Sequence, residues 1–176
     1  MVDPWTYAAK TRNEYAEQAA LFMWANMAQM FGVIVANDPL SYTKKDHAKN
    51  LYDTPWMANV PLVGLKWLHS INNNAGKGDA IRGAMAKAQG VKAFIPDIFL
   101  PVPRYPINGY NEPVKPISGY YIELKRLASE RGAKGKANEG QLACHADLRA
   151  AGYKVDVFEG WELARDGLLS YLGVTT

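Results

Sequence analysis

The stretches IPDIFL (residues 95–100) and YYIELK (Tyr120–Lys125) decide the fold of this 176-residue chain. Each is a short run of apolar and aromatic residues near proline or glycine, a pattern that predicts two β-strands. Because side chains alternate between the faces of a strand, Glu123 and Lys125 project from the same face. If the two strands pair as a hairpin, Asp97 and Glu123 can face each other across it.

Two carboxylates held together in this way are costly unless a cation lies between them. Oxygen ligands without a suitably spaced His or Cys pair favour a hard ion such as Mg²⁺ or Mn²⁺. Such an ion would polarise a phosphoryl oxygen and lower the pKa of a water, while Lys125 could orient that water or neutralise developing charge. The alternative is that Glu123 and Lys125 form an ordinary ion pair on a half-exposed strand. Spacing alone favours that alternative, because E-X-K triplets are common.

The rest of the chain alternates helical and strand patterns, with no internal repeat. Helices are predicted at 12–31, 79–89, 139–151 and 161–172, and further strands at 67–71 and 153–158. This order of hairpin, helix, strand and helix indicates an α/β fold with a small central sheet covered by helices. Residues 33–65 are interrupted by three prolines and predict an irregular insert or lid, and residues 101–118 a proline-rich loop.

Length and composition indicate one domain of a globular protein, with 48% hydrophobic and 21% charged residues. The single cysteine, Cys144, excludes an intramolecular disulfide and a multi-cysteine zinc site. No secretory signal or membrane-spanning stretch is readable, so we expect a cytoplasmic protein. The net charge of +3 is modest. Residues 66–92 and 115–136 each carry a local excess of positive charge. These stretches could bind along a polyanion or could form an ordinary solvated surface, and composition alone favours the solvated surface.

Pro96-Asp97 followed by Glu123-Leu124-Lys125 resembles the PD-(D/E)XK nuclease pattern. The surrounding sequence resembles the virus-type replication-repair nuclease (VRR-NUC) family more specifically. The similar stretches are residues 14–24, 69–76, 84–100, 119–126 and 141–157. The resemblance implies a restriction-endonuclease-like PD-(D/E)XK core, with a small mixed sheet flanked by helices in a single domain spanning residues 1–176.

The same resemblance implies a role for each residue of the motif. Asp97 and Glu123 would hold Mg²⁺ or Mn²⁺, with the backbone carbonyl of Leu124 as a third ligand. Lys125 would assist the attacking water. The sequence departs from the family at Phe94, where a glycine usually precedes the I/V-P-D segment, and in the length of the 33–65 insert.

Two further site residues, Glu14 and Gln141, are implied by the resemblance. Glu14, on the first helix, would complete the acidic cluster, and Gln141 would reach the site from the N-terminal end of its own helix. Each residue also fits an alternative role in a capping box, within residues 11–14 and 138–141. The two roles are compatible, because a helix N-terminus is also a natural place for a phosphate.

Several cationic and polar residues are candidates for contacting the DNA backbone. They are Asn73, Lys77, Arg82, Lys87, Arg126, Lys134 and Lys136. The loop at residues 72–76 could equally be an ordinary strand-to-helix turn. His69 and His145 are expected to pack or to form local hydrogen bonds, and Cys144 to be a small core residue.

The sequence therefore predicts a Mg²⁺- or Mn²⁺-dependent DNA endonuclease. By resemblance to phage stand-alone members, it would be structure-selective, similar to Holliday-junction resolvases, and would act in replication, recombination or repair in the host cytoplasm. Symmetric cutting of a junction requires a two-fold homodimer. The alternatives are a sequence-specific endonuclease of the restriction type and a non-catalytic DNA-binding accessory protein.

Overall fold

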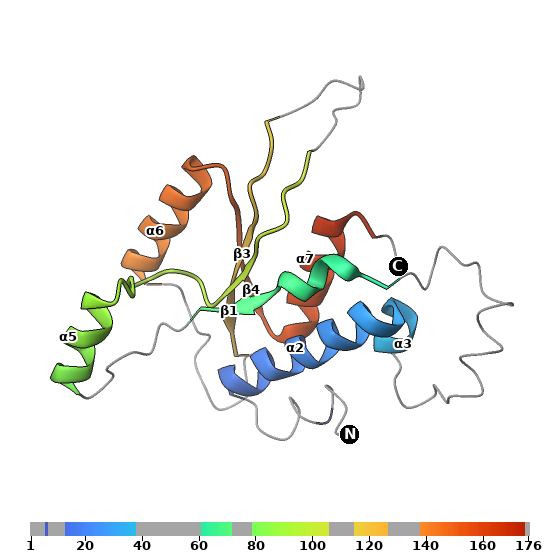
Figure 1. The fold of residues 1–176 in the computed structure, drawn as a ribbon, viewed down its shortest axis with the longest axis horizontal. Helices are drawn as coiled ribbons and strands as arrows, with labels where there is room; N and C mark the ends of the chain where they lie inside the picture. The colour runs from blue at the N-terminus through green and yellow to red at the C-terminus, as the bar shows by residue number, and fades with distance from the viewer. Residues whose placement is uncertain are drawn as a thin grey trace, which may run out of the picture. The chain divides into compact units, whose positions relative to one another are not determined.

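A computed structural model describes residue 6 and residues 13–37, 61–71, 79–105, 115–126 and 138–174 of the chain (Figure 1). In chain order, the elements are α2 (Glu14–Phe31), α3 (Val33–Asn37), the 3₁₀ helix η2 (Val63–Trp67), β1 (His69–Ser70), α5 (Ala80–Ala88), β2 (Ile98–Leu100), β3 (Tyr120–Lys125), α6 (Glu139–Ala150), β4 (Lys154–Glu159) and α7 (Trp161–Leu172).

The described chain forms two compact units. One contains α2, α3, η2 and α7, and the other contains β1, α5, β2 and α6. The boundary passes through β3 after Glu123 and through β4 after Val157. Among the described residues, no helix is both long and apolar enough to cross a membrane.

The four strands form one mixed sheet in the order β1-β2-β3-β4. β1 pairs antiparallel with β2, and β2 pairs antiparallel with β3. The N–H groups of Lys154 and Gly160 donate to the carbonyls of Gly119 and Lys125, at the two ends of β3. Because both sets of residue numbers rise in the same direction, β4 is parallel to β3. The predicted hairpin of the IPDIFL and YYIELK strands is thus confirmed, and so is the α/β fold class.

The β2–β3 ladder carries the apolar core of its unit on one face. Ile98, Leu100, Tyr120 and Ile122 are each completely buried. Ile98 stands opposite Ile122, and Leu100 opposite Tyr120, so the four side chains lie on the same face. Strand alternation therefore directs the neighbouring residues, Glu123 among them, to the other face.

In the other unit, α2 packs against α3, η2 and α7. Its buried side chains include those of Leu21 and Trp24, and the indole N–H of Trp24 donates to Oδ1 of Asn37 at 2.9 Å. Glu17 is also buried, and its Oε2 accepts from the backbone N–H of Trp161 at 2.9 Å. Because Gly160 has no side chain with which to cap α7, Glu17 satisfies an N–H at the start of that helix.

Three predicted elements differ from the structure. The strand predicted at residues 95–100 is limited to Ile98–Leu100, and Asp97 lies in a bend before it. Residues 67–71 were expected to be a strand, but Trp67 belongs to η2 and only His69–Ser70 pair with β2. The expected irregular insert begins with the helix α3, because Val33, Val35 and Ala36 are buried. Residues 38–60 of that insert and 106–114 of the proline-rich loop lie outside the described residues.

Candidate functional site

The antiparallel β2–β3 pairing brings the segment of Asp97 beside the strand that carries Glu123. Ile98, which follows Asp97, stands opposite Ile122, which precedes Glu123, and the ladder ends at this pair, with Asp97 in a bend. Asp97 immediately precedes β2, and its carbonyl accepts from the N–H of Ile71 at 2.7 Å. Its side chain is half-buried. The two predicted acids therefore lie on neighbouring segments of one unit.

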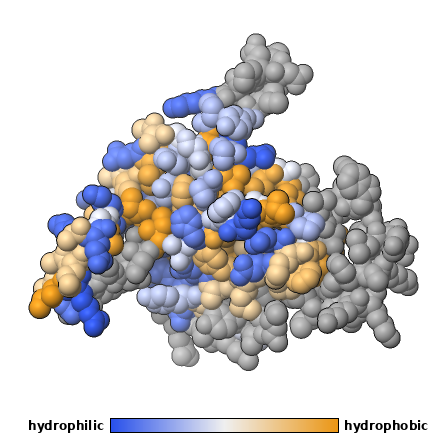
Figure 2. Space-filling view, viewed as in Figure 1, coloured by the Kyte–Doolittle hydropathy of each residue, from blue (hydrophilic) through white to orange (hydrophobic). Residues whose placement is uncertain are grey.

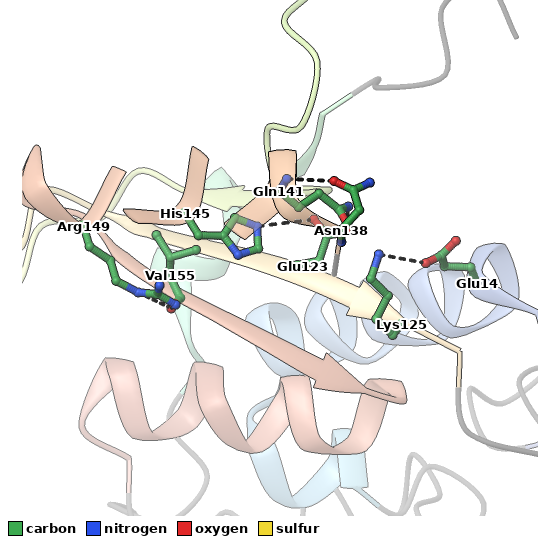
Figure 3. A network of polar contacts seen from close by, with 8 residues as sticks. All are labelled: Glu14, Glu123, Lys125, Asn138, Gln141, His145, Arg149 and Val155. Atoms are coloured by element: carbon green, nitrogen blue, oxygen red, sulfur yellow. Dashed lines mark hydrogen bonds and ion pairs between the residues drawn. The ribbon is translucent and has the colours of Figure 1, made fainter. Parts of the chain in front are cut away.

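The carboxylate of Glu123 is almost completely buried, with 1% of its side chain exposed. Its Oε1 accepts a hydrogen bond from the side-chain amide of Gln141 at 2.5 Å (Figure 3). A buried carboxylate is stable only when hydrogen-bond donors or a positive charge compensate for its lost hydration. The amide of Gln141, from the first turn of α6, supplies part of that compensation.

His145 lies one helical turn beyond Gln141 on α6 and approaches the second oxygen of Glu123 (Figure 3). Its Nε2 is 3.9 Å from Oε2 of Glu123, longer than a hydrogen bond, and its side chain is 1% exposed. Residues at i and i+4 share one face of a helix, so α6 presents both side chains to the same carboxylate. The prediction that His145 packs or forms local hydrogen bonds did not name Glu123 as its neighbour. The spacing Q-X-X-X-H was its sequence signal.

Gln141 forms the predicted capping box and also contacts Glu123, whereas its role in a catalytic site stays a prediction. The Asn138 side chain accepts from the N–H of Gln141 at 2.9 Å, and Oε1 of Gln141 accepts from the N–H of Asn138 at 3.0 Å. This reciprocal pair is the expected capping box at the start of α6. Since the box uses Oε1 of Gln141 as an acceptor, its Nε2 is left to donate to Glu123.

In the other unit, Lys125 at the end of β3 forms an ion pair with Glu14 of α2. Their Nζ and Oε1 atoms are 3.7 Å apart, and 11% of the Lys125 side chain and 53% of the Glu14 side chain are exposed (Figure 3). The alternative capping role of Glu14 is wrong. Asn13 is the N-cap and accepts from the N–H of Ala16 at 2.8 Å, so Glu14 occupies the first helical position.

The chain matches no family model and no curated protein. It is similar to a solved structure described as a VRR_NUC domain protein, with a TM-score of 0.52 and 17% sequence identity. The match covers 92% of this chain and 89% of that one. The chain has a VRR-NUC-like fold.

The two candidate ligands, Asp97 and Glu123, have side chains of the type that binds a hard divalent cation. Asp97 and Glu123 belong to the same compact unit and can offer carboxylate oxygens, and burial of Glu123 makes a counter-charge favourable. Within the described ranges, no three or more His, Cys, Asp and Glu side chains converge on a metal position. A pair of carboxylates suits Mg²⁺, which is commonly held by one or two carboxylates together with waters and substrate phosphates. The carbonyl of Leu124 as a third ligand stays a prediction.

Aromatic side chains lie on the same face of the sheet as Glu123. The rings of Phe99 and Tyr121 stack with centroids 4.2 Å apart, and Tyr153 packs edge-on against both. Burial raises the pKa of Tyr121, with smaller contributions from Tyr153 and Cys144. The half-buried rings of Phe99 and Tyr121 form a pair of the ladder two residues along the chain from Asp97 and Glu123, respectively.

Cys144 on α6 is half-buried, as is typical of a small residue at the edge of a core. Burial raises the pKa of its thiol, and the carboxylates of Asp147 and Glu123 raise it further. The thiolate is therefore disfavoured, and Cys144 is a poor nucleophile at neutral pH.

Three of the predicted DNA-contacting cations of the VRR-NUC-like fold are described and exposed: Arg82, Lys87 and Arg126. Arg82 forms an ion pair of 3.4 Å with Asp79, the N-cap of α5. On this helix, hydrophilic side chains alternate with exposed apolar ones (Figure 2). The other four candidates, which are Asn73, Lys77, Lys134 and Lys136, lie outside the described residues.

Proposed function

We propose that this chain is a Mg²⁺- or Mn²⁺-dependent DNA endonuclease that hydrolyses phosphodiester bonds. The observation that supports the proposal is the antiparallel pairing of β2 and β3, which joins the segment after Asp97 to the strand of a buried Glu123, whose carboxylate accepts from Gln141. The VRR-NUC-like fold supports it, because the description of the similar structure names a nuclease domain.

Each site residue has a defined task in this proposal. Asp97 and Glu123 bind the cation, and Gln141 orients Glu123 through its side-chain amide. When bound, the cation would polarise the scissile phosphate and lower the pKa of the attacking water. Lys125 follows Glu123 by two residues in β3, so strand alternation sends both side chains to the same face. Its ammonium group donates to the attacking water or neutralises charge on the phosphoryl oxygens.

The ion pair between Lys125 and Glu14 supports this task for the lysine. A carboxylate 3.7 Å from Nζ restrains a side chain that otherwise has four rotatable bonds. Because Glu14 is about half exposed, this pair contributes little to stability. The proposed task of Glu14 is to orient the ammonium group of Lys125. Glu14 is also proposed to contribute to the acidic cluster.

The proposed substrate is branched DNA of the kind that arises in phage replication, recombination or repair. The support is the resemblance of the sequence to stand-alone VRR-NUC proteins, which are similar to junction resolvases. Two symmetric cuts require two active sites related by a two-fold axis, so the proposed active species is a homodimer.

The test incubates the full chain with four-way, flap, single-stranded and duplex DNA, with Mg²⁺, Mn²⁺ or EDTA. Metal-dependent cleavage that is fastest on the four-way junction is expected. Asp97→Ala and Glu123→Ala should abolish cleavage but keep DNA affinity, whereas the matched control Asp166→Ala, at an exposed acid of α7, should cleave like the wild type. Cleavage of one linear sequence would favour the restriction-type alternative. Binding without cleavage in every metal would favour an accessory DNA-binding protein, and full turnover by Asp97→Ala would refute the site.

A further inference from the structure

Phe94 adopts a backbone conformation that is unfavourable for a residue with a side chain. Its φ is +68°, and it is the single non-glycine residue with positive φ in the part of the chain that the structure describes. In this region Cβ comes too close to the backbone, so bulky residues are rare outside turns and functional sites. Some other interaction must keep Phe94 in this conformation.

The ring of Phe94 packs against Gly140, in the first turn of α6. A Cβ atom placed on Gly140 would lie 2.7 Å from both Cε2 and Cζ of Phe94. These distances are shorter than any ordinary carbon contact, so the ring touches the glycine backbone at a point where no side chain fits. The ring remains 47% exposed, and hydrophobic burial alone therefore does not account for the strained backbone.

This contact joins the two segments that carry the candidate site. Phe94 precedes Asp97 by three residues, and Gly140 directly precedes Gln141, the residue that holds Glu123. All of these residues belong to one compact unit. A shift of the first turn of α6 would move the amide of Gln141 away from Glu123, and the ring of Phe94 lies against that turn.

We propose that Phe94 is a positioning residue, which places Gln141 and through it the carboxylate of Glu123. The inference rests on the proposed function only in treating Glu123 as the metal ligand. The position of Gln141 can be measured with no metal present.

Two variants separate positioning from simple stability. Phe94→Gly removes the ring and relieves the unfavourable φ, since glycine adopts +68° readily. Gly140→Ala leaves Phe94 in the sequence but displaces its ring, and it replaces glycine by a better helix former. If the contact between Phe94 and Gly140 only stabilises the fold, these two variants should change the unfolding temperature and leave the position of Gln141 unchanged. Phe94→Tyr keeps the ring and is the conservative control.

The main readout is the side-chain amide signal of Gln141 in ¹H–¹⁵N spectra of the metal-free full chain, assigned by its loss in Gln141→Ala. In Phe94→Gly and in Gly140→Ala, the signal should move to the position of a solvent-exposed amide, and Phe94→Tyr should restore the wild-type position. Calorimetric Mn²⁺ affinity should fall about tenfold in the first two variants, as is typical when a partner of a ligand is lost. The double variant should resemble Phe94→Gly, because no ring is left to displace.

A wild-type amide signal in both Phe94→Gly and Gly140→Ala overturns the inference, as does a change confined to unfolding temperature. Additive effects in the double variant also overturn it. If even the wild-type chain binds no Mn²⁺ and cleaves no DNA, the proposed function fails, while the amide spectra still decide whether Phe94 positions Gln141.

Discussion

The side-chain amide of Gln141 donates to Oε1 of Glu123, a carboxylate that is 1% exposed, while Oε1 of Gln141 belongs to the capping box of α6. One side chain thus starts a helix and holds a buried acid. The capping box fixes which end of the amide faces Glu123, since the oxygen is already used as an acceptor. Helix initiation and the orientation of the candidate ligand are therefore coupled.

Replacement of Gln141 tests this coupling. Gln141→Ala should lower the free energy of unfolding by about 1–3 kcal/mol, because a buried acceptor loses its donor. Gln141→Glu keeps the capping acceptor but places a second carboxylate beside Glu123, so it should be less stable than Gln141→Ala at neutral pH. Urea unfolding at several pH values measures both. The difference should shrink on acidification, since protonation removes the repulsion, and an equal loss at every pH would contradict the shared role.

His145 provides the second test of how Glu123 is held. His145→Leu keeps most of the buried volume but removes the imidazole that lies 3.9 Å from Oε2 of Glu123. We expect a loss of about 1–3 kcal/mol in unfolding free energy, because a buried carboxylate loses one of its polar neighbours. Leu142→Ala, at an exposed position of the same helix, is the matched control and should change stability by no more than about 0.5 kcal/mol. Equal losses of unfolding free energy in His145→Leu and Leu142→Ala would show that the imidazole does not stabilise Glu123.

Lys125 should be needed for cleavage but not for metal binding. Lys125→Met keeps the apolar stem and removes the charge, so DNA cleavage is expected to fall by at least about 100-fold, the lower range for loss of a general acid–base group. Calorimetric Mn²⁺ affinity should stay close to that of the wild type. Lys154→Met, at a partly exposed lysine of β4 that is not a candidate DNA contact, serves as control for the loss of one positive charge. Loss of Mn²⁺ binding in Lys125→Met would contradict the division of tasks between the lysine and the acids.

The thiol of Cys144 should alkylate with a pH midpoint above that of an ordinary cysteine. Its pKa is raised by burial and by the carboxylates of Asp147 and Glu123, so at neutral pH it is more fully protonated than a free thiol. Removing a negative neighbour must lower that pKa, and Asp147→Asn is expected to move the midpoint down. Rates of iodoacetamide alkylation between pH 7 and about 10 measure this, around the ordinary thiol pKa of about 8.5. A midpoint below that of a free thiol would contradict the described surroundings.

The exposed cations should appear in the salt dependence of DNA binding. If Arg82 and Lys87 each contact a phosphate, replacing either with alanine should reduce the slope of log affinity against log salt concentration by about 1. Arg165→Ala is a suitable control, because that arginine is mostly buried and pairs with Asp166. Fluorescence anisotropy over a range of salt concentrations measures the slope, and unchanged slopes would place α5 outside the DNA-binding surface.

Local patterns predicted most of the elements and the pairing of the two acids. The residues of α7, the capping box at Asn138–Gln141 and the β2–β3 hairpin all depend on interactions within a few residues, or on one antiparallel ladder. A capping box and strand alternation leave a direct trace in sequence spacing. The strand β1 was predicted too long and the helix α3 was missed, because their extent depends on what packs against them.

The sequence by itself thus determined that Asp97 and Glu123 belong to two segments that adjoin in an antiparallel hairpin, because residue order and strand period are local properties of the chain. Only the tertiary structure decided what surrounds them. That α6 presents both Gln141 and His145 to Glu123, and that the ring of Phe94 lies against Gly140, depends on how a helix packs on a sheet face. Such contacts join residues far apart in the chain, and no spacing in the sequence records the distance between them.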